Sequence, residues 1–228
     1  MTNRIINNKK SDYHIHSVFS DWVATIEELV QFAGKIGMEE IAITDHSDHL
    51  VEILKKVCGI TPSWGARYAL KNRENVHNDV KVIFWVEWDV INEEWDVCLE
   101  SQKIEGKFII LSVHRNGYLS NHETAWKWLI NAIKRHHDKI DCIGHPHDKD
   151  QLWAFIDMKE LVEVANQYNI PMEFNRGTFN KGKAIEDKLM YMLEYANKIY
   201  VNSDSHSLNS LKKQREECYN YLEKHNIH

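Results

Sequence analysis

The sequence predicts an α/β protein, and the main reason is a regular alternation of two kinds of segment. Seven short apolar segments rich in β-branched and aromatic residues have the length of strands, and most are followed by an amphipathic stretch with helical spacing. Repeated strand–helix units imply a parallel sheet with right-handed crossovers. Seven units in 228 residues fit a closed or nearly closed barrel. An open, doubly wound sheet is the alternative, although no glycine-rich phosphate loop follows the first strand.

The predicted strands share this apolar composition and lie at residues 12–17, 40–46, 80–91, 108–114, 142–146, 171–175 and 199–203. The predicted helices share an apolar face and lie at residues 22–35, 61–76, 124–137, 158–168, 184–197 and 208–224. Asn121 and Asp157 are the expected N-caps of two helices, and Pro62 suits the first turn of another. Residues 93–106 have no clear period, and we expect an excursion there between the third and fourth strands.

Composition argues against several classes of protein. An apolar content of 43% in 228 residues can bury one core, so we expect a single domain over residues 1–228. The net charge of −6 argues against a nucleic-acid polymer as the main partner. No apolar run approaches the ~20 residues of a membrane span, and the N-terminus shows no signal-peptide core, which predicts a cytoplasmic protein. The cysteines are scattered, as expected of reduced thiols: Cys58, Cys98, Cys142 and Cys218.

The unusual feature of the composition is its fourteen histidines, and their positions along the chain are informative. Six of them lie at or just beyond the ends of predicted strands: His14, His16, His46, His114, His145 and His206. The carboxyl ends of the strands of a parallel αβ barrel converge on one face, where active sites lie. We therefore expect these six side chains to gather at that face.

The spacing of the charged residues adds chemistry to this placement. His14 and His16 are two apart, so both point to the same side of a strand, and Asp204 and His206 repeat the arrangement. Glu87 lies within an apolar run and needs a partner, because a carboxylate buried alone is costly. Each feature has an ordinary structural explanation by itself. Together they predict a metal site, and imidazoles with carboxylates suit zinc, manganese or iron.

The remaining histidines have a different distribution. Seven lie in helical or terminal stretches, where we expect surface residues: His49, His77, His122, His136, His137, His225 and His228. His147 has the same strand parity as His145 but lies further out, and it is a candidate for contact with substrate.

With these residues in place, the chain resembles the PHP family, the polymerase and histidinol phosphatase superfamily. The matching segments follow the family's order: DYHIHSVFSD, ITDH, WVEWDV, SVHR, IGHP and NSDSH. They extend from Asp12 to His206, which is nearly the whole chain. The resemblance implies a distorted seven-stranded (β/α)7 barrel of the PHP type with two or three divalent metal ions.

The resemblance also implies a ligand set for each ion. The residues that would hold the first ion are His14, His16, Glu87 and Asp204. Glu87 would bridge to a second ion that His114 and His145 also hold. His46 and His206 would hold a third ion together with Asp21. The alternative for Asp21 is that it caps the helix that starts near Trp22, since aspartate is a favoured N-cap.

Within the family, the chain resembles the stand-alone histidinol-phosphatase-like branch, which its MEFNRG segment matches. The function implied is a metal-dependent phosphatase that acts on a small phosphorylated metabolite, with histidinol phosphate, a substrate of histidine biosynthesis, as the named candidate. The alternatives are a phosphodiesterase or nuclease of the same family and a metal-bound module without catalysis.

The expected mechanism depends on the bridging carboxylate. Two metal ions roughly 3.5–4 Å apart would share Glu87 and a water, and would supply hydroxide for in-line attack on phosphorus. The residues expected to be catalytic are Glu87, Asp204 and His206. Those expected to bind substrate are Arg176, Arg115 and His147, with Arg176 first because it follows the sixth strand directly. Lys181 and Lys183 are weaker candidates for the same contact.

Overall fold

The computed structural model describes residues 4–22, 24–59, 78–101, 104–105, 108–118, 121, 123–147, 155–175 and 186–227. The predicted helix at 61–76, the candidate substrate contact Arg176 and the two lysines Lys181 and Lys183 lie outside these residues. Among the described residues, no helix is both long and apolar enough to cross a membrane. The cysteines whose side chains the structure describes, Cys98, Cys142 and Cys218, form no disulfide.

Seven parallel strands form one sheet in the order β1-β2-β3-β6-β7-β8-β9. Their bounds are β1 Ser11–Ile15, β2 Glu40–His46, β3 Lys81–Asp89, β6 Ile109–Ser112, β7 Cys142–Ile143, β8 Met172–Asn175 and β9 Ile199–Asn202. The first and last strands meet, since the His16 amide donates to the Ser205 carbonyl at 3.1 Å. The sheet is therefore a nearly closed barrel, which confirms the predicted fold class over the open alternative.

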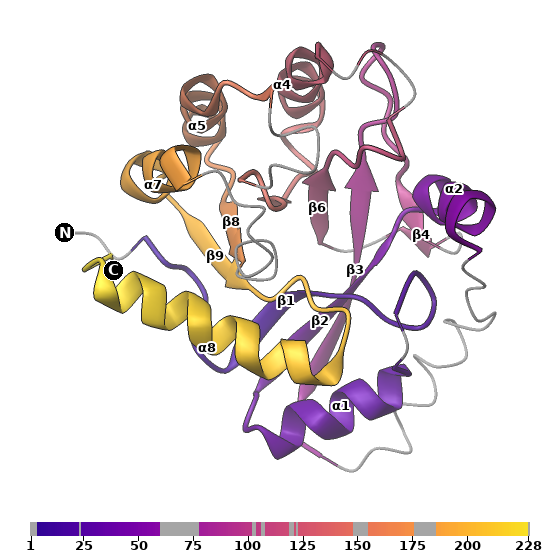
Figure 1. The fold of residues 1–228 in the computed structure, drawn as a ribbon, viewed down its shortest axis with the longest axis vertical. Coiled ribbons are helices and arrows are strands. Elements are labelled where there is room, and N and C mark those ends of the chain that lie inside the picture. The colour runs from indigo at the N-terminus through magenta and orange to yellow at the C-terminus, as the bar shows by residue number, and fades with distance from the viewer. Residues whose placement is uncertain are drawn as a thin grey trace.

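Helices surround this sheet in Figure 1. Their bounds are α1 Ile26–Lys35, α2 Asp48–Cys58, α4 Ala125–His136, α5 Met158–Gln167, α7 Glu186–Tyr195 and α8 Leu208–Lys224. Asp157 caps α5 by accepting from the amides of Lys159 and Glu160, as predicted. The excursion after β3 contains a small antiparallel pair, β4 Glu100–Ser101 with β5 Ile104–Glu105.

Three helices differ from the prediction, two at their N-terminal boundary and one in its presence. Helix α1 begins at Ile26, because Thr25 and Glu28 form a capping box, so Asp21 is not its cap. Helix α4 has Thr124 at its N-cap position, without a capping hydrogen bond from that side chain, and the Asn121 side chain accepts instead from the Glu123 amide in the turn before it. Helix α2 was not predicted, although its sequence DHLVEILKKVC repeats apolar residues with helical spacing.

The strands separate an apolar outer face from a polar inner face. On β3, Val86 and Trp88 are buried in the apolar core, while the alternate residues Glu87 and Asp89 are buried without belonging to it. Phe174 on β8 likewise packs in the core that the helices cover. This alternation follows from the two-residue period of a strand. The helices therefore bury one face, and the other face is left for polar chemistry inside the barrel.

Gly144 lies where β7 ends beside this polar interior. A Cβ atom there would meet the Ser112 hydroxyl well inside van der Waals contact and Ile110 Cγ2 at 2.8 Å. Ser112 in turn donates to Glu87 Oε1 at 2.7 Å. The close approach of β7 to β6 therefore requires glycine.

We predict that Gly144→Ala lowers the free energy of unfolding by about 1–3 kcal/mol, because overpacking forces the neighbouring side chains to shift. Urea denaturation of the chelator-treated protein measures this without a contribution from bound metal. Gly117→Ala is the control, since its nearest new contact is the tip of Leu50 at 3.3 Å. Equal losses in the two variants would contradict the assignment.

Candidate metal centre

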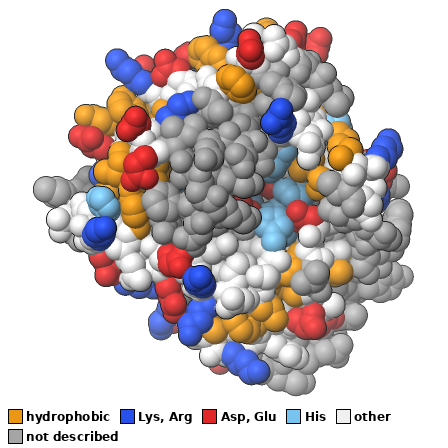
Figure 2. All heavy atoms as spheres, viewed as in Figure 1, with side chains coloured by type: hydrophobic (Ala, Val, Ile, Leu, Met, Phe, Trp, Pro, Cys, Tyr) orange, Lys and Arg blue, Asp and Glu red, His pale blue; other side chains and the backbone are white. Residues whose placement is uncertain are grey.

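The polar inner face carries a compact group of histidines and carboxylates at the carboxyl ends of the strands. It contains all six histidines and three carboxylates that the sequence singles out: His14, His16, Asp21, His46, Glu87, His114, His145, Asp204 and His206. His14, His16 and Glu87 are fully buried. The His206 side chain is 37% exposed, so the group opens to solvent on that side. Figure 2 shows histidine side chains gathered in a hollow of the face drawn there.

Glu87 lies at the middle of this group. Its Oε1 atom is 2.9 Å from His145 Nε2, 3.4 Å from His14 Nε2 and 3.5 Å from His114 Nε2. Its Oε2 atom is 2.7 Å from His46 Nδ1 and 3.7 Å from His16 Nε2. One carboxylate therefore faces five imidazoles, which is the position that a ligand shared between two cations needs.

Three sets of side chains have ligand atoms within 4.8 Å of one another. They are His16, Asp21, His46 and His206; His14, His16 and Asp204; and His46, Glu87 and His114. The described side chains bring together the residues that the family resemblance groups, with several differences in detail. Glu87 belongs to one of the three sets and His145 to none, although His145 Nε2 lies 2.9 Å from Glu87 Oε1. His16 belongs to two sets, and His46 lies between Glu87 and Asp21 and belongs to two sets as well.

The donor atoms in these sets fit metal ions. His14 Nε2, His16 Nε2, His46 Nδ1 and Glu87 Oε2 are buried and make no well-aligned hydrogen bond among the described residues, although His46 Nδ1 and Glu87 Oε2 lie 2.7 Å apart. A buried polar atom without a partner costs free energy. Each of these atoms offers a lone pair when the ring or carboxyl group is deprotonated, and imidazole nitrogen with carboxylate oxygen suits transition-metal ions. Divalent cations would satisfy all four atoms at once.

The pKa values show how strongly these groups are coupled. Burial raises the pKa of Glu87, but His114, His14 and His46 outweigh it and hold that pKa well below its usual value. Burial lowers the pKa of His14, but Glu173 and Glu87 raise it well above its usual value. His16 differs, because burial and then His206 and His46 lower its pKa to about 3. His16 is therefore a neutral imidazole, the form that binds metal.

A second layer of carboxylates, which the sequence did not single out, orients these imidazoles. Glu173 on β8 accepts from His14 Nδ1 at 2.8 Å and from the His145 amide at 2.9 Å. Asp89 accepts from His114 Nδ1 and, at 2.9 Å, from the Ser47 hydroxyl. Because an ionised carboxylate only accepts, a ring that carries a single proton keeps it on Nδ1 and presents its Nε2 lone pair to Glu87. The sequence does carry a signal for both carboxylates. Asp89 is two residues after Glu87 and so points to the same side of its strand, and Glu173 lies within the predicted strand at residues 171–175, next but one to the polar Asn175.

A loop after β1 holds Asp21 at the mouth of the group. Asp45 accepts hydrogen bonds from the Ser17 amide, the Ser17 hydroxyl and the Ser20 hydroxyl, each at 2.7 Å. Asp21 Oδ2 then lies 3.1 Å from His206 Nε2 and 3.4 Å from His46 Nε2. The loop thus brings Asp21 together with the two histidines expected beside it.

Two residues of the group have strained backbones. His145 has φ 28° and Asp204 has φ 48°, in the left-handed region that favours glycine. Strain of this kind costs of order 1–3 kcal/mol per residue and persists only where the surroundings fix it. Glu173 fixes His145 through its amide, and the pairing of β1 with the segment after β9 fixes the chain around Asp204.

The candidate substrate contacts are placed differently from one another. Arg115 is described and exposed. His147 is fully buried, and its Nε2 lies 3.1 Å from the Asn175 carbonyl. Arg176 follows Asn175 directly but lies outside the described residues.

The fold and the clusters together define a class, an αβ-barrel protein with sites that could hold metal ions. A PHP domain model matches residues 12–177, more than half of the chain, and the chain belongs to this family of metal-dependent phosphoesterases. The sequence is 27% identical over 209 residues to DNA polymerase/3'-5' exonuclease PolX of Bacillus subtilis, covering 89% of this chain and 35% of that protein. This chain thus spans about a third of PolX.

Two further comparisons cover most of both proteins. The sequence is 27% identical over 203 residues to a protein named "Probable phosphatase" of Caldicellulosiruptor bescii, covering 85% of this chain and 78% of the other. The structure resembles that of histidinol phosphate phosphatase from Lactococcus lactis complexed with zinc, L-histidinol and phosphate. The TM-score is 0.61 with 19% identity, and the match covers 96% of this chain and 95% of the other. This likeness shows the fold.

We predict that Glu173→Gln weakens metal binding about 10- to 100-fold, the usual effect of losing a carboxylate that orients a metal-binding histidine. Competition with a chromophoric chelator for zinc measures the affinity. Glu163→Gln, an exposed position on α5, is the matched control. Unchanged zinc affinity in Glu173→Gln would show that His14 needs no such support.

We also predict that Asp21→Ala removes about one metal ion per chain and leaves the stability of α1 unchanged, because Thr25 caps that helix. Thr25→Ala should do the reverse, with a loss of about 1 kcal/mol of stability and intact metal content. Elemental analysis and thermal unfolding of both variants check this. Full metal content in Asp21→Ala would exclude Asp21 as a ligand.

Proposed function

We propose that this protein is a metal-dependent phosphomonoesterase that acts on a small phosphorylated metabolite, with histidinol phosphate as the leading named candidate. The observation that carries the proposal is Glu87, buried among five imidazoles, each with a ring nitrogen facing it. Family membership supports phosphoester chemistry, and the phosphatases among the relatives support a monoester. The similar fold of a histidinol phosphate phosphatase is the reason for naming that substrate.

Residues of this chain would hold two or three divalent ions, with zinc, manganese or iron as candidates. His14, His16 and Asp204 would hold one ion, and Glu87 would bridge it to a second ion with His114 and His145. When bound, such ions polarise a phosphoryl oxygen and lower the pKa of water.

The chain also provides a third ligand group at the opening of the site. Asp21, His46 and His206 would hold a further ion there. The partly exposed His206 and Asp204 line this side, so an entering phosphate would meet them first. Glu87 is fully buried beneath them, where the exclusion of water would strengthen its interaction with cations.

Basic residues near the opening would bind the phosphate oxygens. Arg176 is the first candidate, since it follows β8 directly, and Arg115 is the second, since it follows His114. Charge-assisted contacts of this kind suit phosphate. His147 would contribute from within the barrel. Its contact with the carbonyl of Asn175, the residue before Arg176, places it beside the segment that carries this arginine.

A phosphodiesterase acting on nucleic acid is the second candidate. The sequence alignment with PolX, which covers 89% of this chain, favours this candidate, because the name of that protein includes the term 3'-5' exonuclease. The net charge of −6 argues the other way, because binding to a phosphate polymer depends on basic side chains.

We predict that the zinc- or manganese-loaded protein hydrolyses phosphomonoesters, histidinol phosphate and p-nitrophenyl phosphate, faster than bis-p-nitrophenyl phosphate or single-stranded DNA. Chelation should abolish the activity. Glu87→Gln should lose at least about 100-fold in kcat, as expected for a group that organises the charge-stabilising site, while His137→Gln on the surface stays active. Faster cleavage of DNA would select the nuclease, and full metal content with no hydrolysis of any ester would select a non-catalytic module.

A further inference from the structure

The barrel closes at a seam between its first and last strands, and this seam separates two groups of candidate ligands. His14 and His16 lie on the β1 side, and Asp204 and His206 follow β9. Main-chain bonds across the seam include His16 to Ser205 at 3.1 Å and Ser205 to His14 at 3.3 Å. The geometry of the candidate metal-binding set His14, His16 and Asp204 therefore depends on how β1 and β9 are held together.

Asp12 is the side chain that joins the two sides of the seam. It is fully buried on β1, and its Oδ1 atom accepts from the His14 amide at 3.0 Å and from the Ser203 amide at 3.3 Å. Ser203 directly precedes Asp204. A single carboxylate oxygen thus fixes the backbone next to a candidate ligand on each strand.

Arg215 on α8 lies behind this carboxylate. Its side chain is 6% exposed, and its Nε atom lies 3.3 Å from Asp12 Oδ2. Its Nη2 atom donates to the Asn8 carbonyl at 3.1 Å, and its guanidinium lies 6.0 Å from the centre of the Tyr219 ring. Removing one partner of a buried ion pair leaves an uncompensated charge, so loss of Arg215 would act directly on Asp12.

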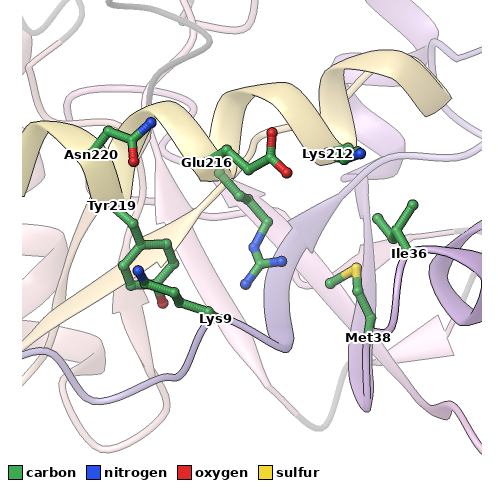
Figure 3. A pocket seen from close by; sticks show the side chains of 8 residues that line it. Lys9, Ile36, Met38, Lys212, Glu216, Tyr219 and Asn220 are labelled. Carbon is green, nitrogen blue, oxygen red and sulfur yellow. The ribbon is translucent and has the colours of Figure 1, made fainter.

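Arg215 also lines a cavity of about 150 Å³ between α8, the segment before β1 and the end of α1, shown in Figure 3. Lys9, Met38 and Lys212 line the same cavity. Lys9 is paired with Glu223 at 2.6 Å, as Arg215 is with Asp12, so these cations are balanced within the protein. Because Arg215 lines the cavity, a small solute that enters the cavity can reach the space that the Arg215 side chain occupies.

We infer that Arg215 is a positioning residue for the metal centre. Through Asp12 it holds the His14 and Ser203 amides in place and so sets the distance between the candidate ligands His14 and Asp204. The inference rests on the proposed function, in which these two residues hold a metal ion. The inference extends the site to α8, a helix outside the barrel. The positions of the candidate ligands alone do not indicate a role for this helix.

A purely structural role for the ion pair makes a different prediction. If the pair only stabilises the fold, its loss lowers the unfolding temperature but leaves the metal affinity of the folded protein unchanged. If it positions ligands, the affinity of the folded protein falls, and refilling the space with a guanidinium ion restores it.

The test uses the full chain with Arg215→Ala, and Lys212→Ala as the control on the same helix and cavity. We expect zinc affinity, measured by chelator competition below the unfolding temperature, to fall about 10- to 100-fold in Arg215→Ala. Millimolar methylguanidinium should recover most of that loss, and should leave Lys212→Ala and the unmodified chain unaffected. Unchanged zinc affinity in folded Arg215→Ala, or a loss that methylguanidinium does not reverse, would overturn the inference.

A second variant keeps the test decisive if Arg215→Ala does not fold. Asp12→Asn retains an oxygen for the two amides but turns an amide group toward Arg215, so zinc affinity should fall here too. Wild-type affinity in folded Asp12→Asn would overturn the inference. Measurement of the unmodified chain separates the two proposals, because absence of zinc binding there would reject the metal centre itself.

Discussion

The structure depends on one buried carboxylate, Glu87, which faces five imidazoles inside a barrel. A carboxylate taken out of water needs compensation, and here the compensation comes from histidines on four other strands or their ends. Each of those histidines needs a fixed orientation in turn. The inner face of the barrel is therefore polar along its carboxyl end, and the stability of the fold comes from the apolar outer face that the helices cover.

The support around Glu87 is arranged in layers. Glu173 and Asp89 fix the rings of His14 and His114, so that their Nε2 atoms point inward. Asp45 fixes the loop that carries Asp21, and Asp12 fixes the seam of the barrel. Side chains preorganised in this way would lower the cost of binding a cation, because little would have to move when it arrives. The strained backbone at His145 and Asp204 belongs to the same arrangement.

Much of the fold could be predicted because its signals are local. All seven strands were located from their apolar runs, and the gathering of six histidines followed from one rule about the carboxyl ends of parallel strands. Asp157 was recognisable as a cap for a similar reason. Helix α1 was predicted to start too early, since Thr25 competes with Asp21 and only the folded turn shows which side chain reaches the amides.

The rest depends on contacts between distant segments, which spacing does not reveal. Glu173 and His14 are 159 residues apart in sequence yet share a hydrogen bond. Asn121 is a residue type that often caps helices, but the chain forms one more turn before α4 begins. The pairing of Arg215 with Asp12 across 203 positions of sequence is likewise invisible until β1, β9 and α8 are assembled. Residue types predicted the chemistry of the centre, and the tertiary fold determines which carboxylates support it.

The central claim is that Glu87 is shared by two metal ions. Its most direct test is an anomalous-scattering map from crystals grown with zinc, with data collected on both sides of the zinc absorption edge. We expect at least two peaks beside Glu87, one on the side of His14 and His16 and one on the side of His114 and His145. A map with no peak there, and with Glu87 hydrogen-bonded directly to the imidazoles, would contradict it.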